Sequence, residues 1–287
     1  MAAETPLSRC RLAFVAKANP RAVRIVTWNI HCGQDEGLPW QRLDWPRRKL
    51  SLRTALSQAQ PDILCVQEAR PGQVAYLEHL LPSHERIGVG RDNGSAKGEH
   101  CAIYFDCLRF ERLAERTFWL DEPSDTLRPG WSFAIRRICT RVELRDRISN
   151  RGVCVYNTHL PLTERARRDA ARVVLRQIAA SDRSDVVVLA ADFNAPPSAA
   201  SRSSFTRAGL ADTAALAGHS RGPKTFHLCG IALRSLDGIL VGPGAVVERY
   251  QVLDSKPGNL FPSDHFGILV DLSYIPKGSL DPRRRHP

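Results

Sequence analysis

The sequence of 287 residues lacks any run of the ~20 apolar residues that a membrane-spanning helix requires. Charged residues interrupt residues 1–22 before an apolar stretch long enough for a secretory signal can form. The eight cysteines include no Cys-x-x-Cys pair, and no group of Cys and His has the spacing of zinc ligands. A P-loop is also absent, which argues against nucleotide-driven work. These absences predict a cytoplasmic protein with reduced thiols.

Hydrophobic residues make up 43% of the chain and charged residues 25%, which are the proportions of a globular domain with a sizeable core. Lys and Arg number 41 against 30 Asp and Glu, so the formal net charge is +11. Such an excess suits a polyanionic partner such as nucleic acid. Only six of the basic residues are Lys, and a general bias toward Arg in the coding sequence is a second explanation. Charge alone therefore leaves a nucleic-acid-binding face open.

Short β-rich runs dominate the chain, and helical patterns interleave with them. Hydrophobic periodicity predicts helices over residues 46–59, 72–81 and 163–180, the last with Thr163 as its N-cap. Strands are predicted near Arg24–Trp28, Ile63–Gln67, Cys101–Phe105, Phe110–Trp119, Arg137–Leu144, Val153–Thr158, Val186–Ala191, Ile239–Val241 and Gly267–Leu272.

The organisation of these elements predicts one domain, because no low-complexity linker, repeat or break in composition divides the chain. Hairpin-like strands together with crossover helices fit two packed sheets between outer helices. We expect this domain to span residues 23–275. An N-terminal extension over residues 1–22 and a basic tail over residues 276–287 would flank it.

Polar and ionisable residues collect where the apolar strands end or begin. Ligand sites in sheet proteins favour the loops outside strand ends, so we expect these side chains to converge. Each residue alone has a structural explanation, such as a turn, a cap, a surface ion pair or a satisfied core histidine. Their joint placement at strand termini favours a functional site. The residues are Asn29, Glu68, His159, Asp192, Asn194, Asp237, Asp264 and His265.

These residue types match the needs of phosphate-ester hydrolysis. The oxygens of a phosphate ester are already negative, so catalysis needs a hard cation, which carboxylate and amide oxygens bind better than thiolates do. It also needs a base that holds water, donors for the charge of the transition state, and help for the leaving oxygen. Asp, Glu, Asn and His provide these functions. The pattern therefore predicts a divalent-metal-dependent phosphoesterase.

Six short motifs contain these residues and follow one another along the chain: Thr27-Trp28-Asn29-Ile30-His31, Pro61-Asp62-Ile63-Leu64-Cys65-Val66-Gln67-Glu68, Asn157-Thr158-His159-Leu160, Asp192-Phe193-Asn194, Leu236-Asp237-Gly238-Ile239-Leu240 and Ser263-Asp264-His265-Phe266. They resemble the motifs of the endonuclease/exonuclease/phosphatase superfamily and occur in its order. The resemblance implies a four-layer α/β/β/α sandwich of two packed mixed sheets with outer helices, with the site at one rim of the sheets. The final motif and its neighbours are also similar to tyrosyl-DNA phosphodiesterases of the second type, and other segments resemble a bacterial-type branch.

The resemblance also implies a cofactor, Mg²⁺ or Mn²⁺, and a set of ligands for it. Glu68 corresponds to the principal metal ligand, and Asn29 and Asp264 correspond to residues close to the metal or its waters. Two departures from the family pattern concern the surroundings of the site. Gly238 stands where many relatives have an aromatic residue, which predicts an open pocket wall, and Cys32 begins a segment where DNA-repair members usually have an Asp-Gly turn.

The remaining motif residues correspond to catalytic groups. Asp192 resembles the residue that orients or deprotonates the attacking water, and Asn194 resembles a donor to the phosphoryl oxygens. His265, paired with Asp237, resembles a histidine that contacts the phosphate or transfers a proton. His159 resembles a second histidine at the scissile phosphate. Which of Asp192, His159 and His265 acts as base or acid stays open.

Three functions compete for this sequence. A nuclease or phosphodiesterase acting on nucleic acid, as a monomer, fits the net charge. A phosphatase or phosphodiesterase for a sugar, inositol or lipid head-group phosphate fits the undistinguished substrate loops, and an inactive binding module is disfavoured because no motif position is substituted. For the first function the candidate phosphate contacts are Arg91, Lys97 and Arg137, followed by Arg136, Arg165, Arg167 and Arg168.

Overall fold

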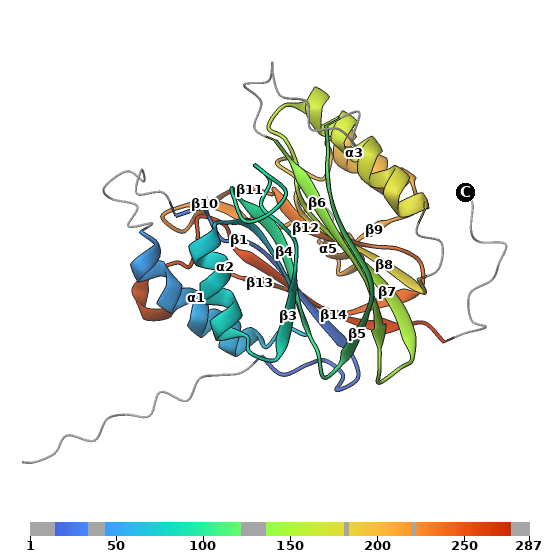
Figure 1. Ribbon diagram of the computed structural model, residues 1–287, viewed down its shortest axis with the longest axis horizontal. Coiled ribbons are helices and arrows are strands. Elements are labelled where there is room, and N and C mark those ends of the chain that lie inside the picture. Colours follow the sequence, from blue (N-terminus) through green and yellow to red (C-terminus); the bar gives the residue numbers. More distant parts are fainter. Residues whose placement is uncertain (1–14, 34–43, 122–135, 181–183, 220–221, 277–287) are drawn as a thin grey trace, which may run out of the picture.

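Two six-stranded mixed sheets pack face to face in the computed structural model, which describes residues 15–33, 44–121, 136–180, 184–219 and 222–276 (Figure 1). In each sheet one central pair of strands is parallel and the other neighbours are antiparallel. The first sheet contains, in spatial order, β13 (Ala245–Leu253), β14 (Gly267–Tyr274), β1 (Val23–Asn29), β2 (Ile63–Ala69), β4 (His100–Asp106) and β3 (His84–Ile87). The second sheet contains β5 (Phe110–Trp119), β6 (Ile138–Asp146), β7 (Arg151–His159), β8 (Val186–Asp192), β12 (Asp237–Val241) and β9 (Ala211–Asp212).

Helices cover the outer faces of both sheets (Figure 1). Buried apolar side chains of α1 (Trp45–Ala59) and α2 (Pro71–Leu80) pack on the first sheet. Those of α3 (Glu164–Ala179) and α4 (Ala200–Arg207) pack on the second. The predicted four-layer α/β/β/α sandwich is therefore confirmed. Smaller elements complete the fold: α5 (Thr213–Leu216), a hairpin of β10 (Phe226–Leu228) and β11 (Ile231–Arg234), and the 3₁₀ turn η1 (Pro257–Asn259).

The core between the two sheets is built from alternate positions of the strands. β1 contributes Val23 and Ile25 to this core, and β8 contributes Val186, Val188 and Ala190. Side chains of a strand alternate between its two faces, so the next residues in each inward series also face the opposite sheet. Polar residues that continue these series at the strand ends therefore point the same way as the core residues.

A polar link between the sheets marks the end of the apolar core. Gln67 on β2 donates from Nε2 to Asn157 Oδ1 on β7 at 2.7 Å and to Thr27 Oγ1 at 3.0 Å. Asn157 in turn donates from Nδ2 to the carbonyl oxygens of Val66 and Ala102, at 2.9 and 2.8 Å. All three side chains are fully buried. Gln67 Oε1 has no hydrogen-bond partner among the described residues, whereas the other polar atoms of the two amides are bonded. These bonds join the two sheets beneath the rim.

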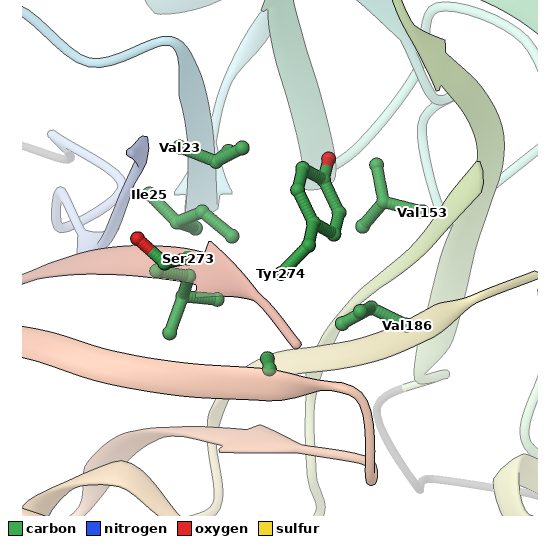
Figure 2. A pocket seen from close by; sticks show the side chains of 8 residues that line it. Val23, Ile25, Val153, Val186, Ser273 and Tyr274 are labelled. Atoms are coloured by element: carbon green, nitrogen blue, oxygen red, sulfur yellow. The ribbon is translucent and has the colours of Figure 1, made fainter. Parts of the chain in front are cut away.

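The opposite end of the sandwich differs in chemistry. There the first residues of β1, β7 and β8 and the end of β14 line a small apolar pocket (Figure 2). Its walls include Val23, Ile25, Val153 and Val186, with the ring of Tyr274 projecting among them (Figure 2). Charged groups also occur near this end, such as Arg109 with Asp62 and Asp146, but they pair with one another, whereas the predicted site residues lie at the other rim.

All predicted helices and strands are present, and several further elements escaped the sequence criteria. β3 is a short edge strand with three partly exposed residues, and α4 is rich in Ser and Arg without a clear apolar repeat. β13 is also an edge strand, in which only Leu253 is buried. Elements that bury little apolar surface carry weak periodicity, which explains why they were missed.

Residues 15–22, the described part of the predicted N-terminal extension, pack against the first sheet. The Val15 amide donates to Gln58 O at 3.1 Å, and the Lys17 ammonium lies 2.7 Å from Asp62 Oδ1. Residues 1–14 lie outside the described residues, as does the predicted basic tail apart from its first residue. Among the described residues, no helix has both the length and the apolar character needed to cross a membrane.

A buried ion pair far from the polar rim gives a test of the fold. Arg24 on β1 contacts Asp271 on β14 through two bonds, of 2.7 and 2.9 Å, and both side chains are almost fully buried. We expect Arg24→Met to lower the free energy of unfolding by about 3–5 kcal/mol, because Asp271 would keep a buried charge without its main partner. Urea unfolding monitored by circular dichroism measures this loss.

The control is Arg172→Met, which removes an exposed ion pair with Asp169. That change should cost less than about 1 kcal/mol, because exposed pairs contribute little. Equal effects of the two substitutions would show that the Arg24–Asp271 pair is not a structural constraint.

Candidate active site

The strand alternation that builds the inner core also brings polar side chains together at one rim. Asn29, His159 and Asp192 continue the inward series of β1, β7 and β8. The register places both His159 and Asp237 directly beside Asp192, on its parallel and antiparallel neighbours. His265 lies just before β14, the antiparallel partner of β1. The predicted convergence of these residues is therefore observed.

The side-chain amide of Asn29 connects the two sheets at this rim. Its Nδ2 donates to Glu68 Oε1 on β2 and to Asp192 Oδ2 on β8, both at 2.9 Å. Its Oδ1 accepts from the backbone amide of His31 at 3.0 Å, so the amide is oriented from both ends. One buried donor thus holds two carboxylates from different sheets close together.

Glu68 reaches this position through a local break in the strand. The β2–β4 register shifts between Val66 and Ala69, and Glu68 itself has a φ of 63°. His31 and Asn194 also have left-handed backbone, with φ of 55° and 49°. Non-glycine residues rarely adopt this conformation, and it concentrates at functional sites. The sequence carries no signal for the bulge, so this feature was missed.

His265 forms a buried pair with Asp237. The distance from His265 Nδ1 to Asp237 Oδ2 is 2.8 Å, and neither side chain is more than 7% exposed. Burial alone would lower the pKa of His265. The charge of Asp237, its hydrogen bond, and the charges of Asp192 and Asp264 outweigh burial and raise the pKa of His265 to about 10. His265 is therefore a cation at neutral pH, with Nε2 4.0 Å from Asp192 Oδ2.

The pKa of the Asp192 carboxyl group is also shifted upward, because this acid is buried near another carboxylate. Burial, followed by the nearby charge of Asp237, raises the pKa of Asp192 to about 7, although His265 and the bonds from Asn29 and the Asn194 amide partly offset this. The Asn194 amide donates to Asp192 Oδ1 at 2.8 Å. A carboxylate with a pKa near neutrality is suited to accept a proton during turnover.

His159 is held in one neutral tautomer by Asn194. Asn194 Nδ2 donates to Leu160 O at 2.8 Å, which fixes the orientation of the amide, and it lies 2.8 Å from His159 Nε2. Nε2 must then accept, so the proton of His159 resides on Nδ1. Burial and the positive charges of Arg137, His265 and Arg91 hold the pKa of His159 well below its usual value. Both amide hydrogens of Asn194 are thereby engaged, so here the side chain orients His159.

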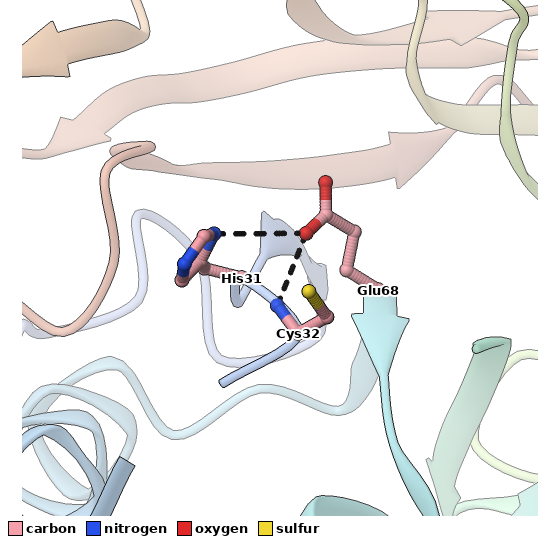
Figure 3. A group of neighbouring side chains, drawn as sticks. All are labelled: His31, Cys32 and Glu68. Atoms are coloured by element: carbon pink, nitrogen blue, oxygen red, sulfur yellow. Dashed lines mark hydrogen bonds and ion pairs between the residues drawn. The ribbon is translucent and has the colours of Figure 1, made fainter. Parts of the chain in front are cut away.

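His31 and Cys32 bring atoms that could hold a metal ion close to Oε2 of Glu68. Figure 3 shows His31 and Cys32 beside this carboxylate: His31 Nδ1 is 3.8 Å from Oε2, and the Cys32 amide donates to Oε2 at 3.0 Å. His31 Nδ1 also lies 3.6 Å from Asp264 Oδ2. The Glu68 and Asp264 side chains are 19% and 23% exposed. Two partly open carboxylates fit a hydrated divalent cation such as Mg²⁺ or Mn²⁺.

Two arginines, Arg48 (buried) and Arg167 (half-buried), hold the backbone around these groups, and the sequence did not single out their supporting role. Arg48 on α1 donates to Ile30 O at 2.8 Å and to Pro262 O at 2.6 Å, which joins the loops after β1 and before β14. Arg167 on α3, a candidate phosphate contact in the sequence, donates to Asn194 O at 2.9 Å and pairs with Glu164. Both act on loop carbonyl groups, which have no periodic signature.

The three main candidate phosphate contacts differ in their surroundings. Arg137 is buried and, with Arg91, lines a pocket beside Glu68. Arg91 is already paired with Glu99 through bonds of 2.7 and 2.8 Å. Lys97 is exposed on the β3–β4 loop and is not part of the pocket wall. The structure thus brings Arg137 and Arg91 close to the site.

The expectation of an open pocket wall at Gly238 is wrong. A side chain at this position would point away from the inner rim, toward the guanidinium of Arg202 and the ring of Phe193. Arg202 lies 4.4 Å from the centre of that ring and pairs with Asp212 at 2.9 Å. Gly238 alternates with Asp237, so it faces the outer layer, and Arg202 fills the space there.

Two sequence motifs that are typical of enzymes with a nucleophilic Cys or Ser occur in this chain, but in other structural settings than in those enzymes. Cys139 and Arg145 have the Cys-x5-Arg spacing of a phosphatase loop, but they lie along the straight strand β6. Cys139 is fully buried, and burial raises its pKa well above the usual value, so it is a poor nucleophile. Residues 218–222 read Gly-x-Ser-x-Gly but follow the short helix α5 instead of a strand, and Ser220 lies outside the described residues.

Comparison with known proteins identifies one matching family and several similar proteins. A model of the family described as "Endonuclease/Exonuclease/phosphatase family" matches residues 26–265. Nocturnin of Drosophila melanogaster is 26% identical over 199 residues, which are 61% of this chain and 29% of Nocturnin. Protein angel of Drosophila melanogaster is 26% identical over 174 residues, 56% of this chain and 47% of that protein. The chain thus spans less than half the length of these two relatives.

Solved structures share the fold over most of the chain. An endonuclease/exonuclease/phosphatase from Bacteroides vulgatus has a TM-score of 0.79 and 26% identity, covering 88% of this chain and 99% of that one. A mannosyl-6-phosphatase from Bacteroides thetaiotaomicron has a TM-score of 0.78 and 25% identity, covering 88% and 100%. TDP2 of D. rerio with a single-strand DNA product shares the fold, with a TM-score of 0.69 and 20% identity over 88% of this chain and 99% of that one.

The His265–Asp237 pair predicts a measurable change in titration. In Asp237→Asn, the pKa of His265 should fall from about 10 toward the ordinary value of ~6.5, because the largest favourable charge is lost. Nuclear magnetic resonance of the metal-free protein, with His265→Gln to assign the signal, measures both values. The exposed Asp254→Asn serves as the control.

Stability should change with the same sign. A histidine whose folded pKa exceeds its unfolded value contributes stability that is complete below about pH 6.5 and is lost as the pH rises through about 10. Wild type should therefore lose more unfolding free energy than Asp237→Asn across that window. Identical titration midpoints for His265 in the two proteins would contradict the assignment of the pair.

Proposed function

Because the chain belongs to the endonuclease/exonuclease/phosphatase family, we propose that it hydrolyses a phosphate ester at the rim around Glu68 and Asp192. The observation that carries this proposal is the shared hydrogen bond of Asn29. It places a partly open carboxylate and a buried carboxylate at 2.9 Å from one amide nitrogen. A cation ligand and a proton acceptor thus lie side by side, as attack of water on phosphorus requires.

Asp192 supplies the proton acceptor in this proposal. Its pKa of about 7 leaves a substantial fraction of the carboxylate ionised at neutral pH while keeping it basic. The Asn29 amide and the Asn194 backbone amide hold its two oxygens, so its remaining lone pairs have a fixed direction. Asp192 therefore orients a water molecule and takes its proton as the water attacks.

The two histidines supply donors of different kinds. His265 is cationic, and its Nε2 faces the space beside Asp192, so it stabilises negative charge on the phosphoryl or leaving oxygen. His159 is neutral and carries its proton on Nδ1, so it donates without adding a charge. Asp237 and Asn194 are positioning residues, because each fixes the ring orientation of one histidine.

Glu68 and Asp264 would hold the divalent cation in this proposal, with Asn29 orienting the Glu68 carboxylate. When bound there, Mg²⁺ or Mn²⁺ would polarise the phosphoryl group and offset its negative charge. Asn29 donates to Oε1 of Glu68, and the Cys32 amide donates to Oε2, with His31 Nδ1 3.8 Å from Oε2. Both oxygens of the carboxylate are therefore held by neighbouring groups.

A small phosphate ester is the substrate class that the geometry supports best. The pocket beside Glu68 is narrow, with buried walls that include Cys101, Arg137, Ile138 and His159, so it has space for a water-sized group such as one phosphoryl oxygen but not for a bulky substituent. The mannosyl-6-phosphatase of similar structure supports the same class. Nucleic acid remains the second candidate because the net charge is +11, although the candidate contact Arg91 is engaged by Glu99.

Metal dependence gives the first test of this function. We expect hydrolysis of p-nitrophenyl phosphate to require Mg²⁺ or Mn²⁺ and to cease in excess EDTA. Glu68→Gln should weaken Mn²⁺ binding, measured by electron paramagnetic resonance, and lower kcat/KM by about 10²-fold. Glu78→Gln, a surface substitution on α2, is the control. Full activity in EDTA, or unchanged Mn²⁺ affinity in Glu68→Gln, would exclude the proposed metal site.

Salt dependence tests the nucleic-acid candidate. Binding of duplex DNA through about three phosphate contacts would give a log–log salt slope near −3, because each contact releases counterions. The double substitution Lys97→Glu and Arg168→Glu, at exposed residues outside the pocket wall, should then flatten the slope, as measured by fluorescence anisotropy, while hydrolysis of a small ester continues. Absence of DNA binding at low salt would rule this candidate out and leave the small phosphate ester.

A further inference from the structure

The pocket beside Glu68 contains two polar groups whose hydrogen-bonding capacity is unused. Arg137 Nη1 and His159 Nδ1 are both buried, and neither has a hydrogen-bond partner among the described residues. Both side chains line this pocket, on the side of Glu68 that faces away from His31. A buried donor without a partner costs about 1–3 kcal/mol, so such groups need a ligand or a solvent molecule to explain them.

Arg137 has no ion-pair partner of its own among the described residues, and the carboxylate of Glu68, which also lines the pocket, is assigned to the divalent cation in the proposed function. Arg91 and Glu99 neutralise each other through their two bonds. Arg137 is only 7% exposed, and within the described part of the chain no carboxylate forms an ion pair with it. A buried guanidinium without a counterion favours an anionic ligand, and its planar donors match a phosphoryl group.

The position of these donors relative to the catalytic groups indicates how many non-bridging phosphate oxygens the ligand has. A phosphate monoester has three non-bridging oxygens, whereas a diester has two. In the proposed function, Glu68 and Asp264 would hold a divalent cation that offsets the charge of one oxygen, and His265 faces another. His159 Nδ1 lies 3.9 Å from Glu68 Oε1, so the pocket that it shares with Arg137 adjoins the reacting group. Arg137 is thus placed to bind a third oxygen.

The walls of the pocket oppose a second ester group in that direction. His100, Cys101 and Ile138 line the same pocket as Arg137, and each is at most 5% exposed. The pocket is therefore narrow, and much of its wall is buried. An ester substituent on the third oxygen would have to enter this buried region, and it would also remove the negative charge that Arg137 can neutralise.

From these observations we propose that Arg137 selects phosphate monoesters, with His159 Nδ1 as the neighbouring donor to the same group. This inference rests on the proposed phosphoesterase function and assigns its substrate class as a terminal, dianionic phosphate. The reaction is hydrolysis: water forms a new P–O bond, the P–O bond to the alcohol breaks, and the alcohol oxygen takes a proton. Arg137 is not required to exchange a proton and acts by charge and geometry.

The test compares a monoester with a diester in wild type and in Arg137 variants. With Mg²⁺ or Mn²⁺ present, kcat/KM of wild type should be higher for p-nitrophenyl phosphate than for bis-p-nitrophenyl phosphate. Arg137→Met should lower the monoester value by about 10²-fold, as expected for loss of an ionic donor, and change the diester value by less than about threefold. Arg137→Lys should restore part of the monoester activity, because it keeps the charge without the planar fork.

Binding of inorganic phosphate provides a readout that does not depend on turnover. Isothermal titration in the presence of Mg²⁺ should show phosphate affinity reduced about tenfold or more in Arg137→Met. Arg145→Met is the matched control, because it removes an exposed arginine from the same strand. Circular dichroism verifies that each variant is folded, and the wild-type monoester preference and the Arg137→Lys variant keep the test valid if Arg137→Met does not fold.

The outcomes separate this inference from the function on which it rests. If wild type hydrolyses neither ester with either metal, the proposed function is wrong. If it hydrolyses the diester faster, or if Arg137→Met lowers both activities equally and leaves phosphate binding unchanged, monoester selection by Arg137 is wrong. Comparing a hexose 6-phosphate with a 5′-phosphorylated oligonucleotide then distinguishes a small molecule from a nucleic-acid end as the source of the monoester.

Discussion

The hydrogen bonds of one buried amide, that of Asn29, set the geometry on which the rest of the site depends. Two carboxylates from different sheets would repel each other at this distance, and the amide gives each of them a donor at 2.9 Å. The position of Asn29 follows in turn from the alternation of β1, whose apolar residues build the inner core. Beneath it, the Gln67–Asn157 bond joins the two sheets. The same alternation of strand residues therefore positions both the core and the site.

The electrostatics of the rim give two histidines opposite states. His265 lies among Asp237, Asp192 and Asp264, and their charges outweigh burial. His159 is equally buried but lies near Arg137, Arg91 and the cationic His265, so burial and positive charge act in the same direction. The ring of His265 therefore favours its cationic form near neutral pH, and the ring of His159 favours its neutral form. This difference arises from the neighbours across the rim, because both histidines occupy comparable positions at strand ends.

The fold and most of the site residues could be predicted from the sequence because their signals are local. Periodicity located the core strands, and the motifs resembling the superfamily identified residues such as Asp192 and His265. The roles that depend on contacts between distant segments were not accessible. The turn of Glu68 out of its strand, the bonds from Arg48 to two loops, and the engagement of both Asn194 amide hydrogens are properties of the folded chain. Local patterns do not encode such long-range contacts.

The arginine content shows how composition can mislead about a binding surface. Arg24, Arg48, Arg109 and Arg202 are all nearly fully buried, and they bind carboxylates or carbonyl oxygens inside the protein. These arginines act inside the fold, so the count of 41 Lys and Arg does not show how many basic groups a substrate meets. Arg137 differs because its guanidinium is buried at the site and keeps an unused donor. In the proposed function, recognition of phosphate would therefore depend more on this one arginine than on the total charge.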